Sequence, residues 1–347
     1  MSWGPRRSAS RWAWCGMADG DMRRVGLLGG GVIGGGWAAR FALNGIDVRL
    51  YDPDPAAERK VAEMLDNARS ATTRLVRVPL PSEGTVTVVS TVASACEGAD
   101  YVQESAPERI DVKQSLLNEA DAALDPSVVI GSSTSGLLPS LLQEGMTHPE
   151  RLVVGHPFNP VYLLPLVEVC PGRQTSSAAV ARAREVYTSI GMRPLVLAKE
   201  IDGFVADRLL EALWREALWL VADGVATMED VDDAIRFGAG LRWSFMGTML
   251  TYRIAGGEGG MRHFMEQFGP ALQWPWSKLT DVPELTDELL DLMAAQSDAQ
   301  AAGASIRELE RLRDACLVSV IQALAEQDYG AGAVLTEYER RLADPEA

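Results

Sequence analysis

The sequence predicts an α/β protein with a doubly wound, mostly parallel sheet, followed by an all-helical C-terminal domain. Short apolar runs alternate with helical stretches over the first 200 residues, a pattern typical of a parallel sheet with helices on both faces. Beyond residue 200 only helical spacing remains, interrupted by glycine and proline. A chain of 347 residues is long enough for two domains. We expect them at residues 23–200 and 201–347.

The first 22 residues precede the first apolar run. They include charged and aromatic side chains but lack the apolar core of a signal peptide. We expect residues 1–22 to form a disordered N-terminal tail.

The first predicted unit is a strand, a glycine turn, a helix and a second strand. Residues 25–28 are an apolar run that leads into the glycine-rich segment 29–34. Helical spacing follows over residues 37–43, and a second apolar run, 48–51, ends in Asp52. This order is the dinucleotide-binding fingerprint in its structural context, so residues 23–200 are predicted to be a Rossmann-like, NAD-binding domain.

Each glycine of the fingerprint has a predicted task. Gly29 makes the tight turn, Gly31 lets the backbone approach a diphosphate, and Gly34 lets helix and strand pack closely. The predicted cofactor-binding residues of this turn are Gly29, Gly30, Gly31, Val32, Ile33 and Gly34.

Asp52 indicates which nicotinamide dinucleotide is bound. Its carboxylate would accept hydrogen bonds from the adenosine ribose hydroxyls and repel a 2′-phosphate, so we expect NAD as the cofactor. Arg59 and Lys60 keep NADP open as an alternative, because cations in this region could attract the 2′-phosphate.

Four further apolar runs predict the rest of the sheet, at residues 86–89, 101–104, 128–131 and 151–154. Ligands of such sheets bind at the carboxyl ends of the strands. Three loops that carry the sequence motifs fall at such ends, at residues 104–108, 132–135 and 156–157.

Composition excludes several kinds of partner. The formal net charge of −16 argues against nucleic acid, because phosphate contacts need clustered Lys and Arg. No apolar run reaches the roughly 18 residues of a membrane span, so no membrane association is expected. The four cysteines form no CxxC pair, so we expect no metal site and no disulfide framework. Reduced thiols are typical of a cytoplasmic protein.

A nicotinamide-dependent oxidation of an alcohol requires a base that takes a proton near neutral pH, and histidine suits that task. The chain has three histidines, His148, His156 and His263. His156 begins the motif HPFNP (156–160), in the loop expected after the last predicted strand, so it is the candidate base. The structural alternative is a buried histidine that ends a strand.

Four segments resemble the 3-hydroxyacyl-CoA dehydrogenase family: residues 29–34, 132–135, 156–160 and 203–209. The similarity extends from about residue 24 to about residue 300, and it is greatest to the bacterial branch of the family that oxidises L-carnitine. This resemblance implies NAD-dependent oxidation of the 3-hydroxyl of L-carnitine to 3-dehydrocarnitine. It also implies a homodimer, in which the helical domain (201–347) binds substrate and dimerises. A thioesterase domain, which follows in some relatives, is not expected within this chain.

The resemblance also assigns roles to single residues. It makes His156 the base that accepts the proton of the 3-hydroxyl, Glu168 the carboxylate that orients the imidazole, and Ser135 a hydrogen-bond donor to substrate or cofactor. Independently of the family, Glu168 lies in an apolar run and needs a buried partner. The neighbouring serines compete with Ser135 for its role. The resemblance also implies that Glu108, Lys113 and Asn159 lie near the nicotinamide.

Asp207 departs from the family pattern, which has an asparagine that can donate a hydrogen bond to the substrate carbonyl. An ionised aspartate cannot donate one. We hypothesise that Asp207 adds negative charge near a cationic substrate. The alternative is an aspartate that pairs with neighbouring Arg208.

A quaternary ammonium ion binds over aromatic faces, and a carboxylate pairs with arginine. The segment 240–252 offers both, so it is the candidate substrate pocket. Its candidate residues are Arg242, Trp243, Phe245 and Tyr252, with Arg253, Trp214, Trp219, Trp274 and Trp276 as further possibilities. Residues 305–342 predict an amphipathic helix or helix pair that packs on the main body or on a second subunit.

Two other functions compete with the oxidation of L-carnitine. The same mechanism could act on a 3-hydroxyacyl-CoA such as 3-hydroxybutyryl-CoA, or on L-gulonate. A protein of another class would use the fold for structure or NAD sensing without catalysis. The presence of both His156 and Glu168 argues against this second alternative.

Overall fold

The computed structural model describes residues 22–244, 247–255, 264, 266, 286–289, 291–292 and 304–344. The expected tail at 1–22 lies outside these residues except for Met22, which packs against the core of the sheet domain.

One eight-stranded sheet organises the first part of the chain, in the order β3-β2-β1-β4-β5-β6-β7-β8. Its strands are β1 (Arg24–Leu28), β2 (Asp47–Tyr51), β3 (Val86–Val89), β4 (Tyr101–Glu104), β5 (Val129–Ser132), β6 (Leu152–Pro157), β7 (Leu166–Pro171) and β8 (Arg193–Val196). The predicted doubly wound, mostly parallel sheet is confirmed, and each of the six predicted strands is present.

The parallel order is broken once, at β7. Strands β1 to β6 pair in parallel, whereas β7 pairs antiparallel with β6 and parallel with β8. Strands β7 and β8 were not expected from the sequence. The chain returns from β6 through a short connection, which is possible only for an antiparallel neighbour.

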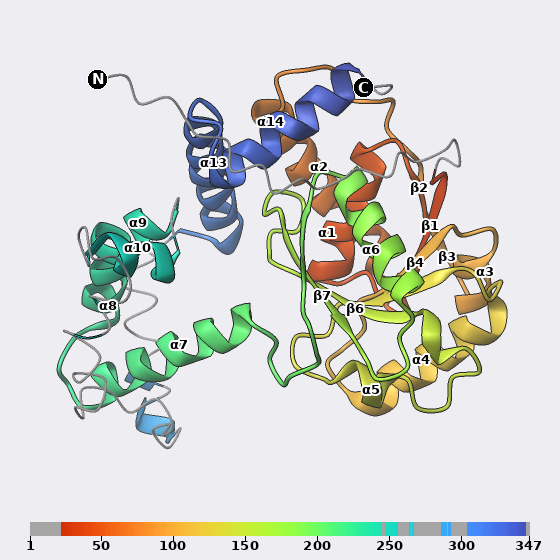
Figure 1. Ribbon diagram of the computed structural model, residues 1–347, viewed down its shortest axis with the longest axis horizontal. Coiled ribbons are helices and arrows are strands. Elements are labelled where there is room, and N and C mark those ends of the chain that lie inside the picture. The colour runs from red at the N-terminus through yellow and green to blue at the C-terminus, as the bar shows by residue number, and fades with distance from the viewer. Residues whose placement is uncertain are drawn as a thin grey trace.

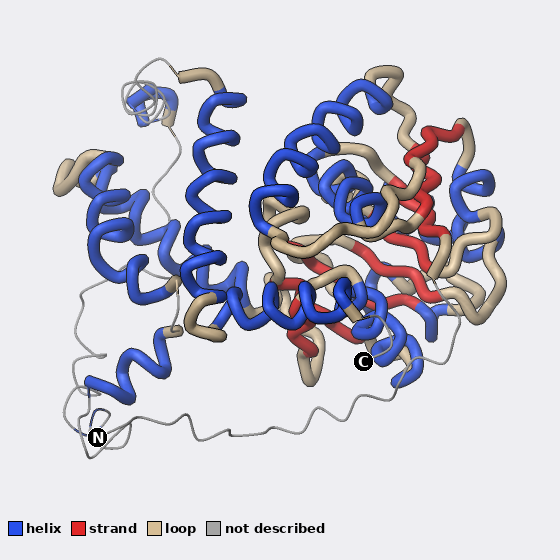
Figure 2. Tube along the Cα trace, turned by 90° about the horizontal axis from the view of Figure 1, so that it is seen from above, coloured by secondary structure: helices blue, strands red, loops and turns tan. Residues whose placement is uncertain are grey.

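Helices cover both faces of the sheet (Figures 1 and 2). One face packs against α1, α2 and α6, and the other against α3, α4 and α5. Their bounds are α1 (Val32–Leu43), α2 (Ala57–Leu75), α3 (Val92–Cys96), α4 (Ile110–Ala123), α5 (Pro139–Leu142) and α6 (Ser177–Ser189), with a 3₁₀ turn η1 (Pro149–Arg151) between α5 and β6. The central strands are buried on both faces by these helices. Side chains on both faces are therefore mostly apolar, which explains the short apolar runs in the sequence.

The region beyond β8 is helical in the part that the structure describes. Its elements are α7 (Ala206–Ala222), α8 (Met228–Ala234), the π turn η2 (Ile235–Ala239), α9 (Gly240–Trp243), α10 (Thr248–Ala255), α13 (Ile306–Ala325) and α14 (Gly330–Ala343). Figure 1 shows α7, α8, α9 and α10 extending away from the sheet. None of the helices among the described residues is long and apolar enough to cross a membrane.

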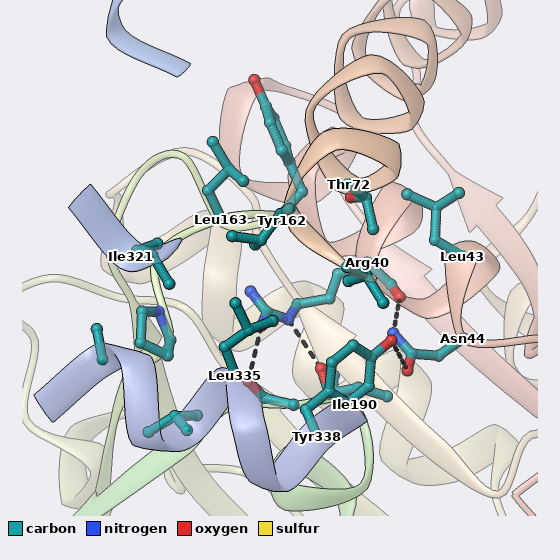
Figure 3. Close-up of a pocket in the computed structure, with 16 residues that line it drawn as sticks. Arg40, Leu43, Asn44, Thr72, Tyr162, Leu163, Ile190, Ile321, Leu335 and Tyr338 are labelled. Carbon is teal, nitrogen blue, oxygen red and sulfur yellow. Dashed lines mark hydrogen bonds between the residues drawn. The ribbon is translucent and has the colours of Figure 1, made fainter. Parts of the chain in front are cut away.

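The last two helices return to the sheet domain, which confirms the predicted amphipathic pair. Val318 and Ile321 of α13 and Leu335 of α14 join a buried cluster with side chains of α1 and α2. Tyr338 of α14 donates a hydrogen bond to Asn44 Oδ1 at 2.8 Å, beside the buried side chain of Arg40 (Figure 3).

Arg40 lies at the centre of this contact. Its guanidinium donates to the carbonyl oxygens of Val161, Ile190, Gly191 and Leu164. Burial lowers the pKa of Arg40 to about 10, and the guanidinium still keeps its charge at neutral pH. The pocket in Figure 3 therefore lies where α1 and α14 pack against the loops that precede β7 and β8.

Candidate active site

The candidate base and its carboxylate face each other across two strands. The antiparallel register of β6 and β7 places His156 directly opposite Glu168. Nδ1 of His156 lies 3.0 Å from Glu168 Oε2, and both side chains are buried. Because an ionised carboxylate only accepts, Nδ1 is the donor in this pair. A neutral His156 therefore presents Nε2 as its acceptor, which is the atom that a base needs.

The other oxygen of Glu168 binds the first turn of the helical region. Oε1 accepts hydrogen bonds from the backbone amides of Val205 at 2.9 Å and Ala206 at 3.0 Å, at the N-terminus of α7. A carboxylate is favoured there by the helix dipole. Burial pushes the pKa of Glu168 upward, but the hydrogen bonds from His156 and from these two amides outweigh burial and hold it below its usual 4.5.

The turn before α7 has an unusual backbone. Gly203 has a φ of 67° and Phe204 a φ of 47°, and the Phe204 side chain is fully buried. Non-glycine residues in this left-handed region are strained unless their surroundings hold them. The rings of Phe204 and Phe158 lie 5.6 Å and 5.4 Å from the His156 ring, between centroids. The turn thus directs the α7 amides onto Glu168 and covers the imidazole.

Asp207 lies at the free side of the imidazole. Its Oδ2 is 3.6 Å from His156 Nε2, and its side chain is one-quarter exposed. Burial raises the pKa of Asp207 above its usual value; the charge of His156 opposes this, and nearby carboxylates add to it. Arg208 donates to the backbone oxygen of Asp202. Asp207 therefore lies beside His156 rather than in an ion pair with Arg208 in the part of the chain that the structure describes.

The glycine turn has the shape that a diphosphate requires. Gly29 has a φ of 105°, and a Cβ placed at Gly34 would lie 1.9 Å from the Gly29 oxygen. A Cβ at Gly31 would meet nothing within 4 Å, so the space above the turn is open. No side chain caps α1, whose first amides can bind an anion. These residues fit NAD.

Asp52 follows β2 as predicted. Its Oδ2 accepts a hydrogen bond from the Gly30 amide at 2.6 Å, which ties the turn to the strand end. Arg59 pairs with Glu63 and Lys60 with Asp54, each at 2.6 Å. The two cations that could attract the 2′-phosphate of NADP are thus each paired with a carboxylate.

A cluster around Glu108 joins the loops after β4 and β5. Glu108 Oε1 accepts hydrogen bonds from the Thr134 hydroxyl and from the amides of Ser135 and Gly136. Lys113 Nζ lies 3.4 Å from Glu108 Oε2. Burial raises the pKa of Glu108, but these hydrogen bonds and the Lys113 charge hold it below its usual value.

Glu104 also belongs to this cluster, although no role was predicted for it. It is fully buried at the end of β4, where it pairs with Lys113 at 2.8 Å and accepts a hydrogen bond from the Ser132 hydroxyl. In the sequence, the signal for this residue is an acid at the end of an apolar run, nine residues before Lys113. The Ser132 hydroxyl is therefore hydrogen-bonded inside the protein. Ser135 and Asn159 are exposed, in loops beyond the carboxyl ends of β5 and β6.

The candidate cation pocket is not assembled next to His156 in this chain. Figure 1 shows α9 and α10, which carry Arg242, Trp243 and Tyr252, on the far side of α13 from the sheet. Tyr252 stacks on Phe264 with ring centroids 4.6 Å apart. Phe245, His263, Trp274 and Trp276 lie outside the described residues, as does the Arg253 side chain. Among the described residues, no group of His, Cys, Asp and Glu could hold a metal ion.

Two family models together match residues 24–287, apart from residue 202. The model of the 3-hydroxyacyl-CoA dehydrogenase NAD-binding domain matches residues 24–201, and that of the 3-hydroxyacyl-CoA dehydrogenase C-terminal domain matches residues 203–287.

Curated relatives are similar over most of their length. A protein of Mesorhizobium japonicum named L-carnitine dehydrogenase is 56% identical over 327 residues, which are 93% of this chain and 90% of that protein. A Ruegeria pomeroyi protein named L-carnitine dehydrogenase/betainyl-CoA thioesterase is also 56% identical, over 92% of this chain but only 66% of its own length. The chain thus spans about two-thirds of such longer relatives.

Solved structures show the same fold. The crystal structure of 5-formyl-3-hydroxy-2-methylpyridine 4-carboxylic acid 5-dehydrogenase, an NAD⁺-dependent dismutase, is 31% identical with a TM-score of 0.73. The match covers 88% of this chain and 99% of that structure.

The Glu168 interactions predict a pH-dependent contribution to stability. Because folding lowers the pKa of Glu168, its contribution is fully present above the ordinary value of 4.5 and is lost as the pH falls through the lower folded value. Glu168→Gln should reduce the free energy of unfolding at neutral pH by about 1.5–3 kcal/mol. Urea unfolding at several pH values should show the gap to wild type shrink below pH 4.5. Glu119→Gln, at an exposed site on α4, is the control; a gap that is independent of pH would contradict the assignment.

Proposed function

The chain belongs to the 3-hydroxyacyl-CoA dehydrogenase family, and from this premise we propose that it oxidises the 3-hydroxyl of L-carnitine to 3-dehydrocarnitine. It is an NAD-dependent oxidoreductase that acts on CH–OH groups. The observation that carries the proposal is the His156–Glu168 pair, which leaves Nε2 available at the same sheet edge as the glycine turn. The names of curated relatives of this chain supply the substrate.

The proposed catalytic step uses His156 as a general base. Nε2 accepts the proton of the substrate 3-hydroxyl, and Glu168 then stabilises the imidazolium through Nδ1. Bound NAD supplies the hydride acceptor. Ser135, anchored through its amide on Glu108, is proposed to orient the substrate oxygen or the cofactor. Asn159 and the Glu108–Lys113 pair are proposed to border the nicotinamide.

The remaining proposed contacts hold the two ends of the substrate and the cofactor. The residues from Gly29 to Gly34 and Asp52 are proposed to bind the diphosphate and adenosine ribose of NAD. Arg242, Trp243, Phe245 and Tyr252 remain our proposal for the carboxylate and the ammonium group. Because α9 and α10 lie apart from His156 within this chain, this pocket requires domain closure or a second copy of the chain.

The enzyme is proposed to be a homodimer that works in the cytoplasm. The cysteines Cys96, Cys170 and Cys316 are free thiols, which suits a reducing compartment. Apolar side chains of α7 face solvent in the single chain: Leu209 is 69% and Trp214 is 51% exposed. An apolar helix face of this kind marks a surface that a partner covers.

The first prediction concerns the substrate. NADH absorbance should rise when the enzyme is mixed with NAD and L-carnitine, and it should stay flat with 3-hydroxybutyryl-CoA or L-gulonate. His156→Asn should lower kcat at least about 10²-fold, because it removes the base. A rise with the thioester or the sugar acid alone would contradict the carnitine assignment while keeping the mechanism. NAD binding with turnover of none of the three would contradict both.

The second prediction concerns Asp207. Asp207→Asn removes one negative charge beside the reacting centre, so KM for L-carnitine should rise on the order of tenfold. KM for NAD should stay within about twofold. Asp66→Asn, which removes an exposed charge on α2, is the matched control. Unchanged carnitine kinetics in Asp207→Asn would eliminate the electrostatic role.

The third prediction concerns assembly. Light scattering on a sizing column should give a mass near twice the 37.5 kDa of the chain at micromolar concentration. Leu209→Asp should shift the mass toward the monomer, because it places a charge in the apolar face of α7. Leu141→Asp, at an exposed position on α5, should not. A wild-type mass of one chain would refute the dimer.

A further inference from the structure

A chain of hydrogen bonds runs through the sheet domain beneath the proposed site. It begins at Tyr101 of β4, passes through Tyr187 of α6 and Gln103 of β4, and reaches Ser133 in the turn after β5. It ends at Ser105, directly after β4. The first three side chains are fully buried, Ser133 is nearly so, and Ser105 is half-buried.

Two glycines leave room for this chain inside the sheet. A Cβ at Gly131 of β5 would lie 2.4 Å from Gln103 Oε1 and 2.6 Å from the Tyr101 hydroxyl oxygen. A Cβ at Gly155 of β6 would lie 1.8 Å from the Tyr187 hydroxyl oxygen. Any side chain at either position would displace the network, and Gly155 directly precedes His156.

The amide of Gln103 fixes the first proton directions. Its Nε2 lies 3.2 Å from the carbonyl oxygen of Gly155, which can only accept. Its Oε1 therefore faces Tyr187, whose hydroxyl donates to it at 2.7 Å. Since the Tyr187 proton is used there, Tyr101 must donate to Tyr187, at 2.8 Å. Burial raises the pKa of both tyrosines, so both keep their protons.

Ser133 then has one direction left for its own proton. Its oxygen accepts a hydrogen bond from Gln103 Nε2 at 2.7 Å and another from the indole Nε1 of Trp37 at 3.0 Å. A hydroxyl has two acceptor positions and one proton. Both acceptor positions are occupied, so Ser133 must donate to Ser105 Oγ at 3.0 Å. The Ser105 hydroxyl is thereby an acceptor toward the core, and its own proton points away from Ser133.

Ser105 lies against the glycine turn. Its amide donates to the Leu28 carbonyl at 2.7 Å, and its carbonyl oxygen is 2.5 Å from a Cβ placed at Gly29. Its own Cβ is 3.3 Å from a Cβ placed at Gly34. In the sheet order, β4 lies one strand beyond the turn in the direction of His156, on the side opposite Asp52. A dinucleotide that starts at Asp52 and crosses the turn toward His156 passes Ser105 with its nicotinamide half.

We propose that Ser105 is a further cofactor-binding residue, whose hydroxyl donates a hydrogen bond to a ribose or phosphate oxygen in the nicotinamide half of NAD. Ser133 is the positioning residue that turns this proton outward, and Trp37 and Gln103 hold Ser133 in that state. The proposal rests on NAD binding alone. A failure of L-carnitine as the substrate would leave it intact.

The test measures nucleotide binding by titration calorimetry on the substrate-free enzyme. Ser105→Ala should weaken NAD and ADP-ribose binding about 2- to 13-fold, the equivalent of one hydrogen bond. AMP, which lacks the nicotinamide half, should bind as it does to wild type. Ser127→Ala removes an exposed hydroxyl before β5, distant from this turn in sequence, and is the matched control.

A second variant tests the direction of the proton. Ser133→Ala keeps the Ser105 hydroxyl but removes the group that orients it, so NAD should bind more weakly than to wild type and more tightly than to Ser105→Ala. Unchanged NAD and ADP-ribose affinities in Ser105→Ala would overturn the proposal. An equal loss for AMP would also overturn it, because the turn itself would then be distorted.

Discussion

The candidate site depends on one buried carboxylate. Glu168 binds the imidazole of His156 with one oxygen and two backbone amides of α7 with the other. A buried carboxylate needs such hydrogen-bond partners, because burial removes the water that would otherwise solvate its charge. The tautomer of the base and the start of the helical region are therefore set by the same group. Glu168 thus links the N-terminus of α7 directly to the imidazole.

The single antiparallel strand makes this arrangement possible. The chain leaves β6 at His156 and returns beside it in β7, so Glu168 lies directly across from the base. The chain then continues through α6 and β8 to the strained turn at Phe204, which directs the backbone amides at the N-terminus of α7 onto Glu168. Asp207 then reaches Nε2 from the first turn of α7. One reversal of direction in an otherwise parallel sheet thus brings together the base, its partner Glu168 and Asp207.

The cofactor side is built on a different principle. The glycine turn offers backbone amides to the diphosphate, while beneath it a polar network whose buried side chains are all hydrogen-bonded runs from Tyr101 to Ser105. Buried polar groups that are all paired rigidify their surroundings. This network joins α1, β4, β6 and α6, so the cofactor turn and the strand of the base are held by common contacts.

The sequence by itself determined what depends on neighbours along the chain. The glycine turn, Asp52 after β2, and the limits of β3 and β4 all follow from local patterns of apolar, glycine and acidic residues. His156 was expected in a loop after a strand at 151–154, whereas it lies within β6. Tertiary structure alone decided which distant side chains meet. The cap of Glu168 on α7 and the proton directions ending at Ser105 depend on how elements pack, and periodicity along the chain does not order elements in space. The proposed pocket around Trp243 was predicted from the aromatic and basic residues of one segment. The structure has the helix of Trp243 apart from the base, because which helix faces meet is a property of packing.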